Sequence, residues 1–412
     1  GMAVELYGKG MVMGIDPGKG ITYEAPMHVN YYAQWAAHNT VVSGAASTSV
    51  PAFKGGGGTK NMGAIQLEAM EPRADKEAVS PYCSFTDTRY TDISTKTPQQ
   101  RTLAIIRTSE TSGYYVDIYR SANAKSNEYV YHNIGNKLEF LDINRKPIAI
   151  KPTDFPISKE PYDPPGFRLI KDYQTTGKTD KNIVALFSLK ENGADKYMQV
   201  LFTGEEDRTF YSGKGPQSGT ADVPYRTMPT PTLICRQEGE AWKHPFIAVY
   251  EPFTSTNNYT VERIENADRA QPDDFTAVNV FNKNGGQQII LQSLNSSQLH
   301  KKETWKFKGS FGVINLEKNQ LNYLYLGKGQ QIAYQQYAIE TKAPDGSANI
   351  IFDGSKLIVS CDRETTVTIP TSSAKAVTIM EKGQTKQVPV IRTKEGISFT
   401  VPAVSNAAIQ IN

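Results

Sequence analysis

The sequence predicts an all-β protein, in which a large antiparallel β-sandwich (a supersandwich) is followed by a smaller C-terminal β module. Three observations favour this fold class. Short runs of β-branched and aromatic residues recur along the chain, separated by turns of Gly, Asn, Asp and Pro. Several of these runs occur in consecutive pairs with a hairpin signal between them. No stretch of a dozen residues keeps the 3.6-residue hydrophobic period of an amphipathic helix.

Three hairpins are predicted in chain order. Their paired strands are expected at 101–106 with 114–119, at 183–187 with 198–202, and at 350–352 with 357–359. Asn192-Gly193 separates the second pair, and Asn-Gly is a strong signal for a two-residue hairpin turn. Asp353-Gly354 separates the third pair.

The spacing of the strands indicates three segments. We expect the main sandwich over residues 1–300, connecting strands over 301–345, and the small terminal module over 346–412. The module is typical of a compact β unit because short Thr- and Val-rich strands follow one another closely. Its strands are predicted at 348–352, 356–360, 365–369, 376–380, 387–391, 397–401 and 407–411.

The composition excludes several classes of protein. The chain has 412 residues, with 45 Lys and Arg against 42 Asp and Glu, so its net charge of +3 does not favour a nucleic-acid partner. No apolar run approaches the roughly 20 residues of a membrane-spanning helix. Cys83, Cys235 and Cys361 are too few and too far apart for a disulfide framework or a CxxC metal site. We expect buried or half-buried thiols. A disulfide between one pair of the three cysteines remains an alternative.

Three long loops are predicted, over residues 55–61, 152–166 and 211–231, and the last of these is rich in Gly, Pro, Ser and Thr. Long loops in β domains often form the walls of clefts. An ordinary surface excursion explains the same composition equally well.

Candidate metal ligands lie near the start of the chain. Of the five histidines, His28 and His38 lie closest in sequence to Asp16. Imidazole and carboxylate groups both bind zinc, which often takes three protein ligands and one open position. His28 is the weaker candidate. A structural histidine and a turn-capping aspartate remain the alternative to a metal site.

Two motifs in the first 45 residues carry a resemblance to a known family. Asp16-Pro17-Gly18 forms an acidic turn, and Ala37-His38-Asn39-Thr40-Val41-Val42 leads into a strand. Together they resemble the C-terminal β-sandwich of the heparinase II/III-like polysaccharide lyases, over roughly residues 3–290 of this chain. The resemblance implies that Asp16 and His38 bind a structural zinc ion. It places the third ligand, a histidine, just before residue 1, so we expect an incomplete zinc site in this chain.

The resemblance also implies the context of the chain. In this family an N-terminal helical toroid supplies much of the active site, and we expect it to be the missing partner domain of the same protein. This chain alone is then expected to catalyse little. The family relationship further predicts a periplasmic or secreted location.

Candidate catalytic residues are a histidine and two tyrosines. Residues 129–135 look like the segment where the family keeps a histidine beside its cleft, which makes His132 a candidate. Tyr31 and Tyr32 are candidates because tyrosine and histidine can transfer protons. For His132 a core histidine is an equal alternative. For each tyrosine the alternative is a half-buried β residue.

Candidate substrate-binding residues are of two kinds. Tyr23 and Trp35 could serve as platforms for sugar rings, whereas Asn39 and Arg120 could bind a carboxylate. The alternative for the aromatic residues is again a half-buried position in a β protein. The alternative for Arg120 is a solvated position on a strand.

The function that the resemblance implies is cleavage of a uronic-acid polysaccharide, such as a glycosaminoglycan or alginate, by β-elimination. A base removes the proton at C5, and an acid protonates the departing glycosidic oxygen. The β-sandwich would supply one wall of the cleft. One rival is a non-catalytic glycan-binding or scaffold β-protein. Another is a β-sandwich glycosidase, which needs two cleft carboxylates that the sequence does not single out.

Overall fold

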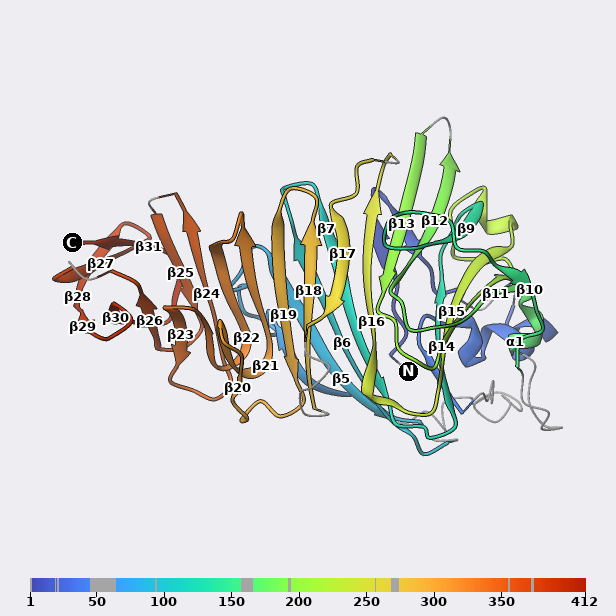
Figure 1. The fold of residues 1–412 in the computed structure, drawn as a ribbon, viewed down its shortest axis with the longest axis horizontal. Coiled ribbons are helices and arrows are strands. Elements are labelled where there is room, and N and C mark those ends of the chain that lie inside the picture. The colour runs from blue at the N-terminus through green and yellow to red at the C-terminus, as the bar shows by residue number, and fades with distance from the viewer. Residues whose placement is uncertain are drawn as a thin grey trace. The chain divides into compact units, whose positions relative to one another are not determined.

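The computed structural model describes residues 2–18, 20, 22–44, 64–92, 95–156, 166–191, 194–255, 257–267, 274–354, 356–371 and 374–412. Across these residues the protein is almost entirely β, which confirms the predicted fold class (Figure 1). The strand pairs are antiparallel. The few helical elements described are η1 (His28–Tyr32, a π-helical turn), η2 (Trp35–Ala37), α1 (Gly166–Leu169) and η3 (Tyr225–Thr227).

The chain divides into two compact units, each built from several segments. The first unit comprises residues 1–67, 88–103 and 112–259, and the second comprises 68–87, 104–111 and 260–412. This division is discontinuous along the chain, unlike the continuous segments expected from the sequence. The predicted boundaries at residues 300 and 345 stay a prediction.

The first unit contains a two-stranded and a six-stranded sheet. The small sheet pairs β1 (Leu6–Gly8) with β2 (Met11–Gly14). The larger sheet has the order β10 (Lys151–Pro152), β11 (Lys171–Thr179), β14 (Arg208–Gly215), β15 (Thr230–Glu238), β8 (Ser126–His132) and β3 (Val41–Ser43).

An eight-stranded sheet begins with strands that contribute residues to both units. Its order is β4 (Gln66–Glu71), β5 (Cys83–Thr91), β6 (Pro98–Arg107), β7 (Gly113–Ser121), β16 (Ala241–Phe253), β13 (Ala194–Phe202), β12 (Ile183–Glu191) and β9 (Lys137–Leu141). In the first unit it forms a sandwich with the six-stranded sheet, because both supply side chains to one core. Tyr129, Phe210 and Leu233 come from one sheet, and Phe187 and Met198 come from the other.

The second unit is built on a sheet of 15 described strands. The main path is β17 (Val261–Asn266), β18 (Phe275–Asn282), β19 (Gly286–Ser293), β21 (Trp305–Glu317), β22 (Gln320–Tyr334), β24 (Gly346–Asp353), β25 (Lys356–Cys361), β31 (Val404–Ile411), β27 (Ala376–Glu381) and β28 (Gln384–Pro389). Off this path lie β20 (His300–Lys301), β23 (Tyr337–Thr341), β26 (Thr365–Ile369), β29 (Ile391–Arg392) and β30 (Ile397–Val401). One apolar core includes Leu291, Ile314, Leu324, Ile350 and Val359.

The three predicted hairpins are confirmed as strand pairs. β6 lies beside β7, and β12 pairs with β13 from Ile183 opposite Phe202. β24 pairs with β25, and Gly354 in their turn has a φ of +60°, a conformation that glycine adopts without strain. Asn192 and Gly193 lie outside the described residues.

The terminal strands follow the prediction with one exception. The strand expected at 387–391 is two strands, β28 ending at Pro389 and β29 beginning at Ile391. A proline has no backbone N–H to continue a ladder, so Pro389 is a natural end point. The two strands then pair with different partners, β27 and β30.

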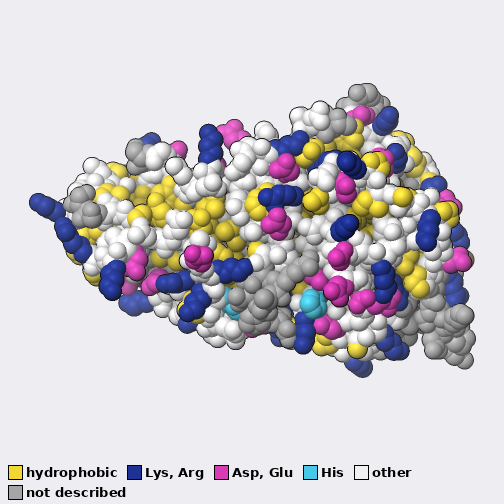
Figure 2. Space-filling model, in the orientation of Figure 1, with side chains coloured by type: hydrophobic (Ala, Val, Ile, Leu, Met, Phe, Trp, Pro, Cys, Tyr) yellow, Lys and Arg dark blue, Asp and Glu magenta, His cyan; other side chains and the backbone are white. Residues whose placement is uncertain are grey.

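The surface and the thiols agree with the composition. Figure 2 shows basic and acidic side chains interspersed over one face of the molecule.

The three cysteines are buried and free, which excludes a disulfide between any pair of them. No helix in the described part of the chain is long and apolar enough to span a membrane.

Candidate active site

Asn39 joins three segments of the first unit. It lies between η2 and β3, and β3 pairs with β8. Its Oδ1 accepts the backbone N–H of His132 at 2.7 Å, and its Nδ2 donates to the carbonyls of Val4 and Ile15, both at 3.0 Å. The side chain is only 1% exposed. The amide is therefore committed to the fold, whereas the sequence suggested a contact with substrate.

The ring of His132, at the end of β8, links Asn39 to Tyr31. Its Nδ1 lies 3.2 Å from Asn39 Oδ1, and its Nε2 lies 3.1 Å from the Tyr31 hydroxyl. The two carbonyls bound by the Asn39 amide nitrogen fix the orientation of the amide, so the atom facing His132 is the oxygen, which can only accept. Nδ1 therefore carries the ring proton, and Nε2 accepts the hydrogen bond from Tyr31.

Burial keeps both members of this pair neutral. It lowers the pKa of His132 to about 3, with a smaller contribution in the same direction from His38 and an opposing one from Asp16. Burial also raises the pKa of Tyr31 far above its ordinary value, and nearby Tyr32 adds to this effect. At neutral pH the pair consists of a phenol that can donate a proton and an imidazole that can accept one.

Asp16 and His38 form a second pair. His38 Nδ1 lies 3.0 Å and 2.9 Å from the two carboxylate oxygens of Asp16, and both side chains are about one quarter exposed. The carboxylate also accepts the Gly18 N–H at 3.4 Å, and the Asp16 carbonyl accepts the Thr220 hydroxyl at 2.6 Å. Burial raises the pKa of Asp16, but the hydrogen bond and charge of His38 outweigh it, so the pKa lies below its ordinary value.

The two pairs belong to one site because His38 and Asn39 are adjacent. Gly14, at the end of β2, forms a bridge with Asn133, just beyond His132. Ile134 N–H also donates to the Met13 carbonyl at 2.9 Å. These contacts hold the turn containing Asp16 beside the end of β8. The fold thus brings together residues that are up to 116 positions apart, from Asp16 to His132.

The geometry of Asp16 and His38 is compatible with two ligands of one zinc ion. Neighbouring ligand atoms on tetrahedral zinc, with bonds of about 2.1 Å, lie about 3.4 Å apart. The observed separations of 2.9 and 3.0 Å are close to that value. Among the described residues, no group of three His, Cys, Asp or Glu side chains could hold a metal ion. A zinc ion here would need ligands in addition to these two side chains, and zinc stays a prediction.

Comparisons with known proteins support the predicted family. Over 360 residues the chain is 30% identical to an endo-acting ulvan lyase of Formosa agariphila, covering 83% of this chain and 43% of that protein. Residues 260–353 match the family model of the endo-acting ulvan lyase C-terminal domain. The resemblance to polysaccharide lyases is confirmed. The chain spans less than half the length of this relative.

Two solved lyases were also matched by structure. A heparinase III gives a TM-score of 0.43 at 10% identity, over 70% of this chain and 35% of that one. The heparan sulfate lyase HepC from Pedobacter heparinus gives 0.37 at 14% identity, over 73% and 37%. Similarity at these scores does not establish a shared fold.

The remaining predicted residues differ in exposure. Tyr23 is 56% exposed and lies edge-on to His28, with ring centroids 4.9 Å apart. Trp35 is half-buried against Tyr90. Tyr32 is buried, and its hydroxyl donates to the Gln217 carbonyl at 2.5 Å. Tyr23 and Trp35 therefore keep surface that a sugar ring could contact.

Arg120 is placed differently from the expectation. Its side chain is 1% exposed and donates to the Trp242 carbonyl. The sequence suggested either a contact with a substrate carboxylate or a solvated strand position. A buried guanidinium in β7 fits neither, because the strand faces a packed interior on the side where Arg120 points.

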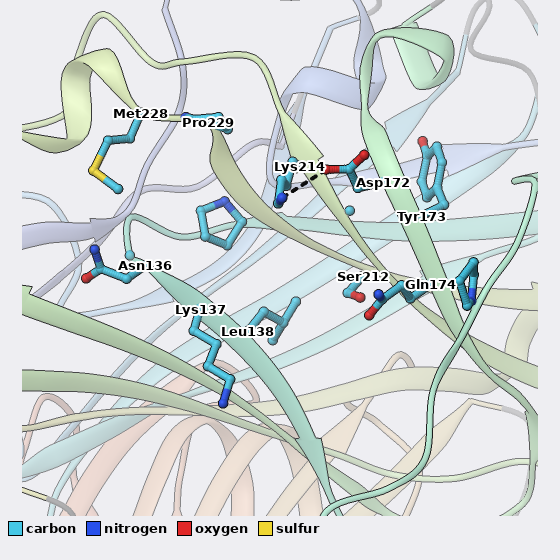
Figure 3. A pocket seen from close by; sticks show the side chains of 14 residues that line it. Asn136, Lys137, Leu138, Asp172, Tyr173, Gln174, Ser212, Lys214, Met228 and Pro229 are labelled. Atoms are coloured by element: carbon cyan, nitrogen blue, oxygen red, sulfur yellow. Dashed lines mark hydrogen bonds and ion pairs between the residues drawn. The ribbon is translucent and has the colours of Figure 1, made fainter.

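A cavity of about 660 Å³ lies elsewhere in the first unit, and none of the predicted site residues lines it. Figure 3 shows Lys214 and Asp172 facing each other beside it, joined by an ion pair of 2.9 Å. Lys137 extends from β9 in the same view. Lys214 lies next to Gly215, where an added Cβ would come within 2.8 Å of the Tyr31 hydroxyl. Strand β14 therefore connects this cavity with the Tyr31–His132 pair.

Sequence reasoning missed the residues that cover the site. Gln217 and Thr220 bond to Tyr32 and Asp16 from the segment between β14 and β15. The signal was the long loop predicted at 211–231, although the described strand β14 extends to Gly215. The two lysines near the cavity gave no signal, since isolated lysines are common on strand surfaces.

Proposed function

We propose that this protein chain forms part of the substrate cleft of a polysaccharide lyase. The lyase would cut uronic-acid glycans at internal linkages by β-elimination. The observation that carries the proposal is the joined pair of dyads, Tyr31–His132 and Asp16–His38, in a chain similar to an endo-acting ulvan lyase. Ulvan, glycosaminoglycans and alginate are the candidate substrates. A periplasmic or secreted location and a helical domain supplied by the same protein belong to this proposal.

The dyads supply the residue types that elimination needs. A proton must leave C5 of the uronate, and another must reach the departing oxygen. Tyr31 can donate a proton. The neutral Nε2 of His132, which lies 3.1 Å from the Tyr31 hydroxyl, can accept one. Where zinc is not bound, Asp16 orients His38 through Nδ1 and leaves Nε2 of His38 for a proton, whereas a zinc ion between the two side chains would replace this hydrogen bond. Tyr23 and Trp35 would support the sugar rings.

Zinc in this site would have a structural role. Asp16 and His38 would hold it together with a ligand from outside the described residues. When bound, the ion would supply a fixed positive charge that holds the turn at Asp16 and the segment at His38 together. The proton transfers would remain with the protein side chains.

The rival function is non-catalytic glycan binding, and one observation favours it. Tyr31 is 0% exposed, so its hydroxyl meets no substrate in this arrangement. A lyase would have to expose the Tyr31 hydroxyl to substrate, or carry out its proton transfers with His38 alone. A binding protein needs neither.

The test is an elimination assay on the natural full-length protein. Ulvan, heparan sulfate and alginate would be tested for the unsaturated uronate product by its ultraviolet absorbance. We expect activity on one glycan, reduced about a hundredfold or more by His38→Ala, by His132→Ala and by Tyr31→Phe, since each removes a proton-transfer or positioning group.

His244→Ala is the matched control. His244 is a histidine of the same unit, its side chain is 55% exposed, and its nearest ion-pair partner is Glu205 at 3.7 Å. This variant should keep full activity. A folded protein that yields no unsaturated product from any of the three glycans, yet binds one of them, would establish the rival function instead.

A further inference from the structure

A second cavity, of about 570 Å³, lies wholly within the second unit. None of the candidate active-site residues lines it. Five of its lining side chains are amides, which is an unusual concentration: Asn282, Asn284, Gln288, Asn315 and Asn322. Amides both donate and accept hydrogen bonds, as sugar hydroxyls do, so the lining matches a hydroxyl-rich ligand.

The sheet register places three of the lining residues in one row. Gln288 on β19 lies opposite Asn315 on β21, and Asn315 lies opposite Tyr323 on β22. Successive strand residues point to opposite faces, so Ile289 and Ile314 enter the apolar core on the other side. The cavity therefore lies on the face of the sheet opposite the apolar core.

Three buried amides form a chain of hydrogen bonds that ends, among the residues that the structure describes, in an acceptor without a partner. Asn282 Nδ2 donates to Gln288 Oε1 at 3.1 Å, and Gln288 Nε2 donates to Asn315 Oδ1 at 2.5 Å. All three residues are 4–5% exposed. Within the described residues, Asn282 Oδ1 is buried without a hydrogen-bond partner. A buried acceptor without a partner is unfavourable, and a ligand hydroxyl that reached it would supply the missing hydrogen bond.

An aromatic pair, one cation and the two carboxylates of Glu110 and Glu317 also line the cavity. Tyr82 stacks on Tyr323 with ring centroids 5.2 Å apart and an angle of 15° between the rings. Arg107 is exposed but held, because its guanidinium donates to the carbonyls of Pro81 and Glu110. A positioned guanidinium favours a carboxylate or sulfate. Glu317 accepts from Asn322 at 2.8 Å, and carboxylates bind sugar hydroxyls as well.

We propose that this cavity is a second, non-catalytic binding site for an acidic saccharide. The amides would bind ring hydroxyls, Tyr82 would contact a sugar face, and Arg107 would bind the acidic group. The proposal goes beyond lyase chemistry, since binding here requires none of the residues of the candidate active site. Such a site would hold a long glycan while another part of the same glycan is cut.

The test measures binding of purified oligosaccharides by isothermal titration calorimetry. The probes are ulvan, heparan sulfate and alginate oligosaccharides, with a neutral cello-oligosaccharide for comparison. The chain itself and its Arg107→Ala/Asn322→Ala variant are compared. Both side chains lie at the rim, so the variant should keep the fold, as thermal unfolding would verify. We expect at least one acidic probe to bind and the variant to bind it at least tenfold more weakly.

Two further variants separate the outcomes. Arg363→Ala removes a 43%-exposed arginine elsewhere in the same unit and should bind as the unchanged chain does. His38→Ala should also bind normally, even if it abolishes elimination. The proposal is overturned if no acidic probe binds, if the rim variant binds as tightly as the unchanged chain, or if His38→Ala alone abolishes binding. Binding that needs calcium and is lost with a chelator would assign the cavity to a cation instead.

Discussion

His132 shows how a single side chain is fixed by its partners. Asn39 sets its tautomer, Tyr31 occupies its other nitrogen, and burial keeps it uncharged. The sequence could suggest His38 and Asp16 as a pair because a motif carried them. It could not show that Asn39 and Arg120 are buried, since their partners lie 93 and 122 positions away. Their burial is decided by tertiary contacts that leave no local pattern.

The low pKa of His132 predicts a loss of stability in acid. Its pKa is about 3 in the folded protein against 6.5 ordinarily, so between these values the unfolded chain binds more protons. The free energy of unfolding should therefore fall as pH drops from 6.5 towards 3. Urea unfolding across this range should show a shallower dependence on pH for His132→Gln. Asn144→Ala, which removes an exposed side chain that does not titrate, should keep the original slope, and an unchanged slope in His132→Gln would contradict the assignment.

The strands show which elements local sequence can predict. Hairpins such as β12–β13 and β24–β25 were predictable because a turn residue and two adjacent runs specify them. The pairing of β3 with β8 was not, because it joins segments more than 80 residues apart. The π-helical turn η1 also escaped prediction, since five residues carry no measurable period.

The junction of β3 and β8 depends on a side chain. The Asn39 amide extends the ladder by accepting the His132 N–H, and it ties down Val4 and Ile15. Asn39→Ala would remove the side-chain partner of two buried backbone groups, the His132 N–H and the Ile15 carbonyl, and of the part-buried Val4 carbonyl. We expect the free energy of unfolding to fall by at least about 2 kcal/mol, as measured in urea. Asn144→Ala, at an exposed turn, should change it by less than about 0.5 kcal/mol.

At the scale of the whole molecule, the positive and negative charges are nearly equal in number. The net charge is +3, and both signs are interspersed on the face seen in Figure 2. An acidic glycan would therefore be bound by particular sites and not by a general positive field. Composition was sufficient to predict the net charge, which depends only on counts, but not the mixing of the two signs over this face.

This balance predicts weak retention on an unrelated polyanion. The chain should pass through phosphocellulose at about 150 mM salt, where surface charges are screened beyond about 8 Å. The salt concentration at which the protein elutes from the column would measure the strength of this retention. Tight retention at that salt would reveal a basic surface that the described residues do not account for.

The interleaving of the two units has a consequence for how such proteins can be recombined. The second unit is assembled from residues 68–87, 104–111 and 260–412, and the matched C-terminal lyase domain covers only 260–353. A crossover near residue 260 would separate that domain from two short segments that belong to its unit. The second unit therefore cannot be transferred as one continuous segment. Moving it into another protein would require transplanting three stretches of chain together.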